Sequence, residues 1–238
     1  MPLPEAFIQH LRKRGYHPRS DRHSNALAAA IVQDLVERCE MISREARSGK
    51  LVYQLNMDLR VGTSAWNVDL VLGSGEAAVV PPGATIARET PSVVRMAIEI
   101  KSVMTEHRKA VKNRKRDFEA HHQHVHGYNR HAIVGAVLVI NSAAGFSSPL
   151  RSQPTVHRDP LRLVEHCMSE MRNVRERGDA GSGMDAKCAI VVDFDNVDLS
   201  KARYVEGPPA PQKGDPLHYD SFLQQLCDKY REHFGRQP

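Results

Sequence analysis

An apolar run at residues 132–140, uninterrupted by any charged or polar side chain, constrains the fold of this chain most strongly. A strand covered on both faces has this composition, whereas a half-exposed strand alternates apolar and polar residues. Residues 51–59, 66–72 and 93–103 also have strand character, with helical patterns before and after them. The order helix, three strands, helix, strand predicts an α/β fold with a central mixed β-sheet flanked by helices.

Two of the predicted strands carry charged side chains near one end. In the strand at 93–103, Glu99 and Lys101 are two residues apart and therefore point to the same face, while their apolar neighbours face a core. In the strand at 66–72, Asp69 points away from the residues expected in the core, Val68, Leu70 and Leu72. Unpartnered charges there would cost several kcal/mol, so a compensating group is required, and a divalent metal ion would supply it.

This arrangement of Asp69, Glu99 and Lys101 resembles the PD-(D/E)XK nuclease superfamily, which includes most type II restriction endonucleases. The proline of the superfamily motif is replaced here by Val68. The resemblance implies a restriction-endonuclease-like core, in which the Asp lies on the second strand and Glu-x-Lys on the third. A surface Glu–Lys pair with an unrelated Asp is the alternative interpretation.

The resemblance also implies a metal site. Asp69, Glu99 and the backbone carbonyl of Ile100 would hold one or two Mg2+ ions, with Mn2+ able to substitute, because hard cations prefer oxygen ligands. The metal would activate a water and offset charge on the scissile phosphate. Lys101 would orient or deprotonate that water, and beside two carboxylates we expect it to stay charged. Glu37 is the first candidate for an accessory acid borne on a helix, ahead of Glu40 and Glu45.

A basic helix is expected soon after Lys101, because most residues from 108 to 116 are cationic. Like charges at helical spacing destabilise an isolated helix by a few tenths of a kcal/mol, roughly, so the cluster indicates an external polyanion such as DNA. A solvated basic face is the alternative. The predicted DNA-binding residues, the last two as candidates for reading base edges, are Arg108, Lys109, Lys112, Lys115, Arg116, Arg130 and Arg151.

Five histidines follow the basic segment, at positions 121, 122, 124, 126 and 131. His122 and His126 have the i, i+4 spacing of zinc ligands on a helix. The cluster contains no acidic residue or cysteine, and a nuclease site prefers oxygen ligands. We therefore expect a polar helix end that lines a DNA-binding cleft, together with Tyr128 and Arg130.

The cysteines and the chain ends indicate the cellular location. Cys39, Cys167, Cys188 and Cys227 are scattered without a Cys-x-x-Cys pair, which predicts neither a zinc knuckle nor a disulfide framework. No segment resembles a signal peptide or a membrane span, so no membrane partner is expected. These features, with a net charge of +5, predict a cytoplasmic protein that binds nucleic acid.

One domain is expected, in three parts. Residues 1–50 form a helical segment that packs on the core, 51–140 the nuclease core, and 141–238 a C-terminal elaboration of loop, helix, strand and helix. The predicted function is that of a Mg2+-dependent endodeoxyribonuclease hydrolysing double-stranded DNA, most like a type II restriction endonuclease. The alternatives are a low-specificity defence or repair nuclease and a catalytically silent DNA-binding subunit.

A homodimer is also expected, because one site cuts one strand and duplex cleavage needs two. The interface is expected among the N-terminal helices or on the apolar stripe of the last helix, formed by Phe222, Leu223, Leu226, Tyr230 and Phe234.

Overall fold

A seven-stranded mixed sheet forms the centre of the computed structural model, which describes residues 3–178 and 181–235. The strand order is β3-β1-β2-β4-β5-β8-β9. The first three long strands form an antiparallel meander, and the next two run parallel to the last of these. The strands are β1 (Leu51–Val61), β2 (Ser64–Ser74), β3 (Ala87–Arg88), β4 (Val93–Val103), β5 (Ile133–Asn141), β8 (Ala186–Asp193) and β9 (Arg203–Tyr204). This architecture confirms the predicted α/β class with a mixed sheet.

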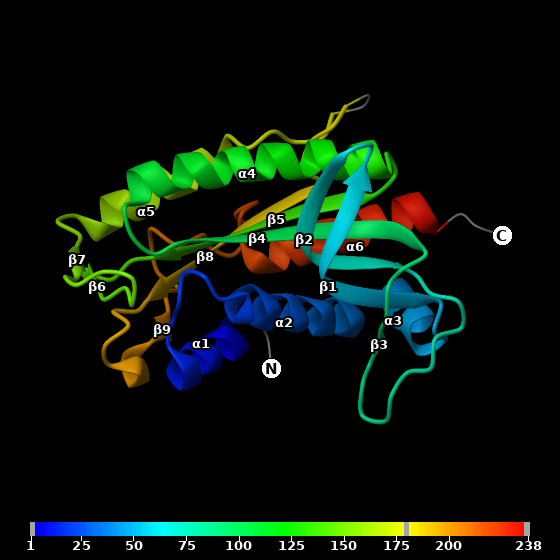
Figure 1. Ribbon diagram of the computed structural model, residues 1–238, viewed down its shortest axis with the longest axis horizontal. Helices are drawn as coiled ribbons and strands as arrows, with labels where there is room; N and C mark the ends of the chain where they lie inside the picture. Colours follow the sequence, from blue (N-terminus) through cyan, green and yellow to red (C-terminus); the bar gives the residue numbers. More distant parts are fainter. Residues whose placement is uncertain (1–2, 179–180, 236–238) are drawn as a thin grey trace.

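Helices cover both faces of the sheet (Figure 1). The lower layer consists of α1 (Leu3–Arg14), α2 (Arg22–Arg38), α3 (Glu40–Arg47) and α6 (Tyr219–Phe234). The upper layer consists of α4 (His107–Tyr128) and α5 (Pro160–Arg172). A two-stranded ribbon of β6 (Gly145–Phe146) and β7 (Thr155–Val156) and a 3-10 turn, η1 (Leu199–Lys201), complete the described chain. None of the helices in the described chain is both long and apolar enough to cross a lipid bilayer.

The central strand β5 is buried along its whole length, as its composition predicts. Its side chains alternate between the two layers, because successive residues of a strand point to opposite faces. Val137 and Val139 pack with the lower layer, and Leu138 and Ile140 pack with the upper layer. The sheet therefore separates two hydrophobic cores.

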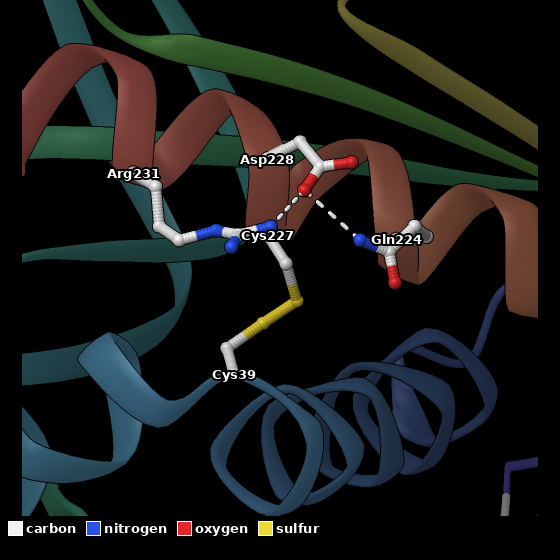
Figure 2. The surroundings of a disulfide bond; sticks show 5 residues. All are labelled: Cys39, Gln224, Cys227, Asp228 and Arg231. Carbon is white, nitrogen blue, oxygen red and sulfur yellow. Dashed lines mark hydrogen bonds and ion pairs between the residues drawn. A yellow bond between two sulfur atoms is a disulfide. The ribbon is translucent and has the colours of Figure 1, made fainter.

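The helical segment predicted at residues 1–50 contains three helices, and its second and third are separated at Cys39. Cys39 has an extended backbone and separates α2 from α3. Its sulfur is disulfide-bonded to Cys227 of α6, with the Cα atoms 5.6 Å apart (Figure 2). The prediction of no disulfide is therefore wrong, because these cysteines are 188 positions apart and only the packing of the lower layer brings them together. The cysteine argument for a cytoplasmic location no longer holds.

The apolar stripe of α6 lies in the core. Phe222, Leu223, Leu226 and Tyr230 are buried against the lower face of the sheet, and Phe234 packs at its margin. The predicted use of this stripe as a dimer interface is therefore wrong, since a core residue cannot also face a second copy.

Candidate active site

The charged residues of β2 and β4 meet where these two strands separate. Their ladder ends with the pair Leu70 and Ile98. Asp69, next along β2, accepts a hydrogen bond from the backbone N–H of Ile100 through Oδ2, at 2.8 Å. A carboxylate thus takes the place of a backbone carbonyl in the ladder and lies beside the Glu-x-Lys segment.

A kink in β1 and β2 produces this separation. Asn56 has a positive φ of 52° and interrupts the β1–β2 register opposite Asp69. Asn tolerates this left-handed conformation better than most residues. Leu70 packs with the lower layer but Val68 packs with the upper layer, so the predicted placement of Val68 and Leu70 on one face is wrong. Past the kink, the hairpin curls towards the C-terminal half of α4 (Figure 1).

Lys101 lies between the two carboxylates. Its ammonium forms an ion pair with Glu99 and lies 3.8 Å from Asp69 Oδ2. Burial lowers the pKa of Lys101, but the attraction of Glu99 and then of Asp69 outweighs burial and raises it. The charged form of Lys101 is therefore favoured, and its ammonium offsets part of the negative charge of the two carboxylates.

Glu99 is the most buried of the three, with 1 % of its surface exposed. Burial raises its pKa from 4.5 to about 7, and the nearby carboxylate of Asp69 adds to this effect against the attraction of Lys101. The indole N–H of Trp66 donates to Oε2 at 3.5 Å, and Nδ1 of the fully buried His121 lies 3.5 Å from the same oxygen. Burial also raises the pKa of Asp69. A cation close to the two carboxylates would therefore stabilise their charged forms.

The donor atoms at this site fit a hard cation. In an extended strand the N–H and C=O of one residue point to the same edge, so the carbonyl of Ile100 faces Asp69 as its N–H does. Asp69, Glu99 and this carbonyl offer oxygen ligands only, which is the set that Mg2+ prefers. Within the described residues no group of three or more His, Cys, Asp or Glu side chains converges.

Glu37 does not reach this site. Ser24, in the first turn of α2, is close enough to lower the pKa of Asp69, and Glu37 follows about 20 Å further along the helix at 1.5 Å per residue. The side chain of Glu37 is exposed and lines a separate hollow with Arg47 and Thr85. The prediction that Glu37 is an accessory acid is therefore wrong. The end of α2 that meets the site is its N-terminus, which carries Asp21 close enough to raise the pKa of Asp69 further.

The predicted basic helix exists as α4, and its cations divide into two groups. Four of these cations are exposed and form no ion pair within the described chain: Arg108, Lys109, Lys112 and Arg116. Lys115 instead lies 3.7 Å from Glu170 of α5, and the neighbouring Arg114 pairs with Asp117. The open cationic stripe therefore excludes Lys115, which sequence spacing had placed with the others.

The two candidate base-reading arginines lie at opposite ends of α4. Arg151 forms an ion pair at 2.9 Å with Glu106, which directly precedes the helix. Arg130 follows the C-terminus, where its side chain donates to His131. The helix between them is about 33 Å long, so the two side chains are too far apart to contact the same base pairs.

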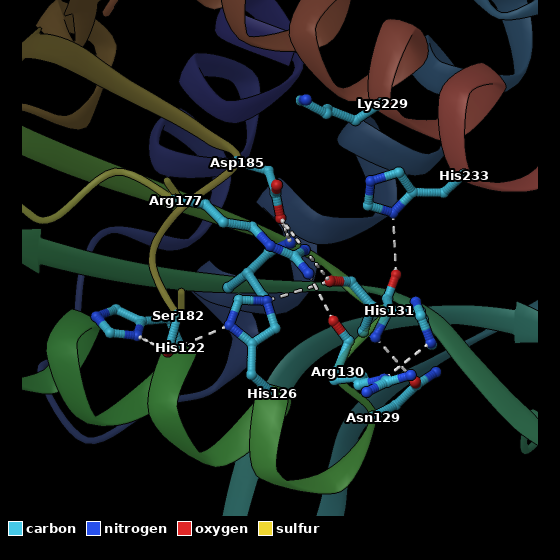
Figure 3. A network of polar contacts seen from close by, with 12 residues as sticks. His122, His126, Asn129, Arg130, His131, Arg177, Ser182, Asp185, Lys229 and His233 are labelled. Carbon is cyan, nitrogen blue, oxygen red and sulfur yellow. Dashed lines mark hydrogen bonds and ion pairs between the residues drawn. The ribbon is translucent and has the colours of Figure 1, made fainter. Parts of the chain in front are cut away.

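The histidines of α4 tie this helix to its surroundings (Figure 3). His122 and His126 both contact the hydroxyl of Ser182, at 2.6 and 3.2 Å, and His122 also contacts Glu119 at 2.8 Å. His124, on another side of the helix, donates to the carbonyl of Leu59 at 2.8 Å. These contacts are internal, so the expectation that the histidine cluster lines a DNA-binding cleft is wrong for these three residues.

Three residues of the site were not predicted: Ser24, Trp66 and His121. The position of His121 could have been read from the sequence, since it continues the buried stripe of α4 at positions 107, 111, 118 and 125. Trp66 and Ser24 carry no such signal, because their contacts depend on the kink of the hairpin and on the approach of α2.

Comparison of the chain with protein-family models, with curated proteins and with solved structures finds no match.

Proposed function

We propose that this chain is a Mg2+-dependent endodeoxyribonuclease of the PD-(D/E)XK type, most like a type II restriction endonuclease. One observation carries the proposal: Asp69, Glu99 and Lys101 come from two strands and converge where these strands separate. The order of helices and strands around them, and an open cationic stripe on the next helix, support the same assignment.

Each residue has a role in this proposal. Asp69, Glu99 and the carbonyl of Ile100 hold Mg2+, which supplies positive charge that activates a water and offsets charge on the phosphate. Lys101 stays charged and orients the phosphate, because a lysine with a raised pKa is a poor base at neutral pH. Trp66 and His121 lie against Oε2 of Glu99, whereas Lys101 pairs with Oε1, and together they keep Glu99 buried.

The proposal includes double-stranded DNA as substrate and a two-fold homodimer as the active species, since each chain carries one site. Sedimentation velocity without DNA tests the dimer, and we expect a species of twice the chain mass at micromolar concentration. A strict monomer would contradict the dimer and favour a nicking activity.

The catalytic assignment is tested by plasmid cleavage with Asp69→Asn, Glu99→Gln and Lys101→Ala. Each variant should lose cleavage in Mg2+ by at least about 100-fold, in line with the loss of a metal ligand or of a preorganised charge. The matched control is Glu89→Gln, which neutralises an exposed acid and should cleave at the wild-type rate.

The products separate the remaining alternatives. Discrete fragments support a restriction endonuclease, whereas a smear identifies a low-specificity nuclease of the same type. Wild-type cleavage by Glu99→Gln would contradict the site, and DNA binding without cleavage by the wild type would identify a silent subunit.

A further inference from the structure

A cavity of about 470 Å³ lies at the end of the upper layer, away from the carboxylates. The first turns of α4 and α5 and strand β7 line it, and Figure 1 shows these elements at one end of the molecule. His107 at the start of α4 is about 21 Å along the helix axis from His121, which contacts Glu99. The cavity is therefore separate from the candidate active site. Its volume lies within the range of pockets that bind small organic ligands.

Three buried polar atoms without a hydrogen-bond partner belong to residues that line this cavity: His107 Nδ1, His157 Nε2 and Thr155 Oγ1. His107 and His157 are 1 % and 6 % exposed, and their rings meet edge to face at 4.5 Å. Buried polar atoms in folded proteins nearly always have partners, so three atoms without one, in residues around a single cavity, indicate that groups from outside the chain supply the partners.

Hydrogen bonding determines what these atoms can accept. His107 Nε2 lies 2.7 Å from the carbonyl of Asn141, and His157 Nδ1 lies 2.7 Å from the carbonyl of Ala143. A carbonyl only accepts, so both of these nitrogens carry protons. Burial lowers the pKa of His107 to about 4, so its ring is neutral and Nδ1 is an acceptor. The lining therefore contains one neutral imidazole, that of His107, whose Nδ1 can accept a hydrogen bond from an N–H or O–H group.

The rim of the cavity is cationic. Arg108, Lys109, Arg158 and Arg162 line it, and the ion pairs of the described chain involve none of the four. The two acids of the lining are already engaged, since Glu106 pairs with Arg151 and the Asp159 side chain caps α5. The N-termini of two helices add positive partial charge. An anionic group is therefore favoured at the rim.

We propose that this cavity binds a nucleotide, with the phosphate at the arginines and lysine of the rim and the amino or hydroxyl groups of base and sugar on His107, His157 and Thr155. A nucleotide combines the two properties that the lining requires, an anion and several hydrogen-bond donors, on a body with apolar faces for Val156 and Leu163. The proposal does not rest on the carboxylate site, because Asp69, Glu99 and Lys101 are not part of the lining, although Arg108 and Lys109 belong both to the rim and to the open cationic stripe.

Isothermal titration calorimetry in EDTA tests the site with the four deoxynucleoside 5′-monophosphates, inorganic phosphate and deoxyadenosine as probes. At least one nucleotide should bind ten times more tightly than phosphate or deoxyadenosine. The double variant Arg158→Ala/Arg162→Ala should lose at least tenfold in nucleotide affinity. The matched control, Arg60→Ala/Arg88→Ala, removes two exposed arginines elsewhere and should bind as the wild type does.

The buried acceptors need variants of their own. Thr155→Val and His157→Phe keep the size of the side chain, and thermal melting shows whether each folds. Both should weaken nucleotide binding by at least threefold and leave phosphate binding unchanged. The proposal would be overturned if phosphate and the nucleotides bind equally tightly. It would also be overturned if the control Arg60→Ala/Arg88→Ala loses as much nucleotide affinity as Arg158→Ala/Arg162→Ala. An absence of nucleotide binding together with Zn2+ binding that His157→Phe abolishes would overturn it as well.

An oligonucleotide with a 5′-phosphate identifies the source of the ligand. If the oligonucleotide binds as tightly as the mononucleotide, the ligand of the cavity is the end of a nucleic-acid strand. If it binds more weakly, the ligand is a free nucleotide. Cleavage activity has no part in these measurements, so failure here leaves the nuclease proposal untouched.

Discussion

The two halves of α4 use their polar residues in opposite ways. The N-terminal half carries Arg108, Lys109, Lys112 and Arg116, which point outward with no acidic partner in the described chain. The C-terminal half carries His121, His122, His124 and His126, and each lies against another segment of the chain. In sequence both halves are rich in basic residue types, Lys and Arg in the first and His in the second.

The difference lies in the partners. A cation held by an internal acid or carbonyl contributes to the fold, whereas a row of unpartnered cations repels itself and gains from an external anion. The proposed DNA contact therefore falls on the N-terminal half, whereas the C-terminal half attaches the helix to its surroundings. Each assignment can be tested separately.

The largest expected effect concerns the one buried histidine of the N-terminal half. The pKa of His107 is lowered from 6.5 to about 4 by burial, so the unfolded chain binds a proton there before the folded chain does. Stability is therefore full above pH 6.5 and falls as the pH drops from 6.5 to 4, by about 3 kcal/mol for this residue. Urea unfolding of His107→Gln between pH 4 and pH 8 should show a shallower acid loss.

The exposed His131→Gln is the control for this measurement and should follow the wild-type pH profile. If His107→Gln loses stability on acidification as steeply as the wild type, the histidine does not titrate as its burial requires.

The second effect concerns the open cations. Lys112→Gln with Arg116→Gln should weaken binding to every DNA duplex equally and lower the slope of log K against log salt by roughly 0.9 for each lost phosphate contact. Lys115→Gln is the matched control, because Glu170 already pairs with that lysine, and its slope should change less. Fluorescence anisotropy over a range of salt concentrations measures both. Equal slopes for the double variant and the wild type would make α4 an ordinary solvated helix.

The smallest effect concerns the attachment of the C-terminal half. Ser182→Ala removes the hydroxyl that contacts both His122 and His126 and should cost about 1–2 kcal/mol of unfolding free energy. DNA affinity and its salt slope should not change. A loss of DNA binding without a loss of stability would reverse the division between the two halves.

The sequence predicts the secondary structure well because the strands are strongly apolar. The run at 93–103 coincides with β4, and the apolar stripe expected on the last helix lies within α6. The common face of Glu99 and Lys101 follows from the two-residue period of a strand alone. Their proximity to Asp69 rests on the resemblance, since no local rule brings two separate strands together.

The errors share a physical cause. Helix period places Lys112, Lys115 and Arg116 together, but it contains no information about α5, whose Glu170 pairs with Lys115. Glu37 was favoured for lying on the right helix, although only the N-terminus of α2 approaches the site. Both errors concern contacts between elements distant in sequence, which periodicity cannot predict.

The disulfide between Cys39 and Cys227 has a consequence for how the two layers open. It joins residues 188 positions apart and so links α2 and α6 covalently beneath the sheet, while Cys167 in α5 remains a free thiol. In the described chain no disulfide restrains α4 or α5 of the upper layer, whereas the disulfide keeps α2 and α6 of the lower layer together. Amide hydrogen exchange should therefore be faster in α4 and α5 than in α2 and α6. Reduction of the disulfide should make this difference in exchange rate smaller.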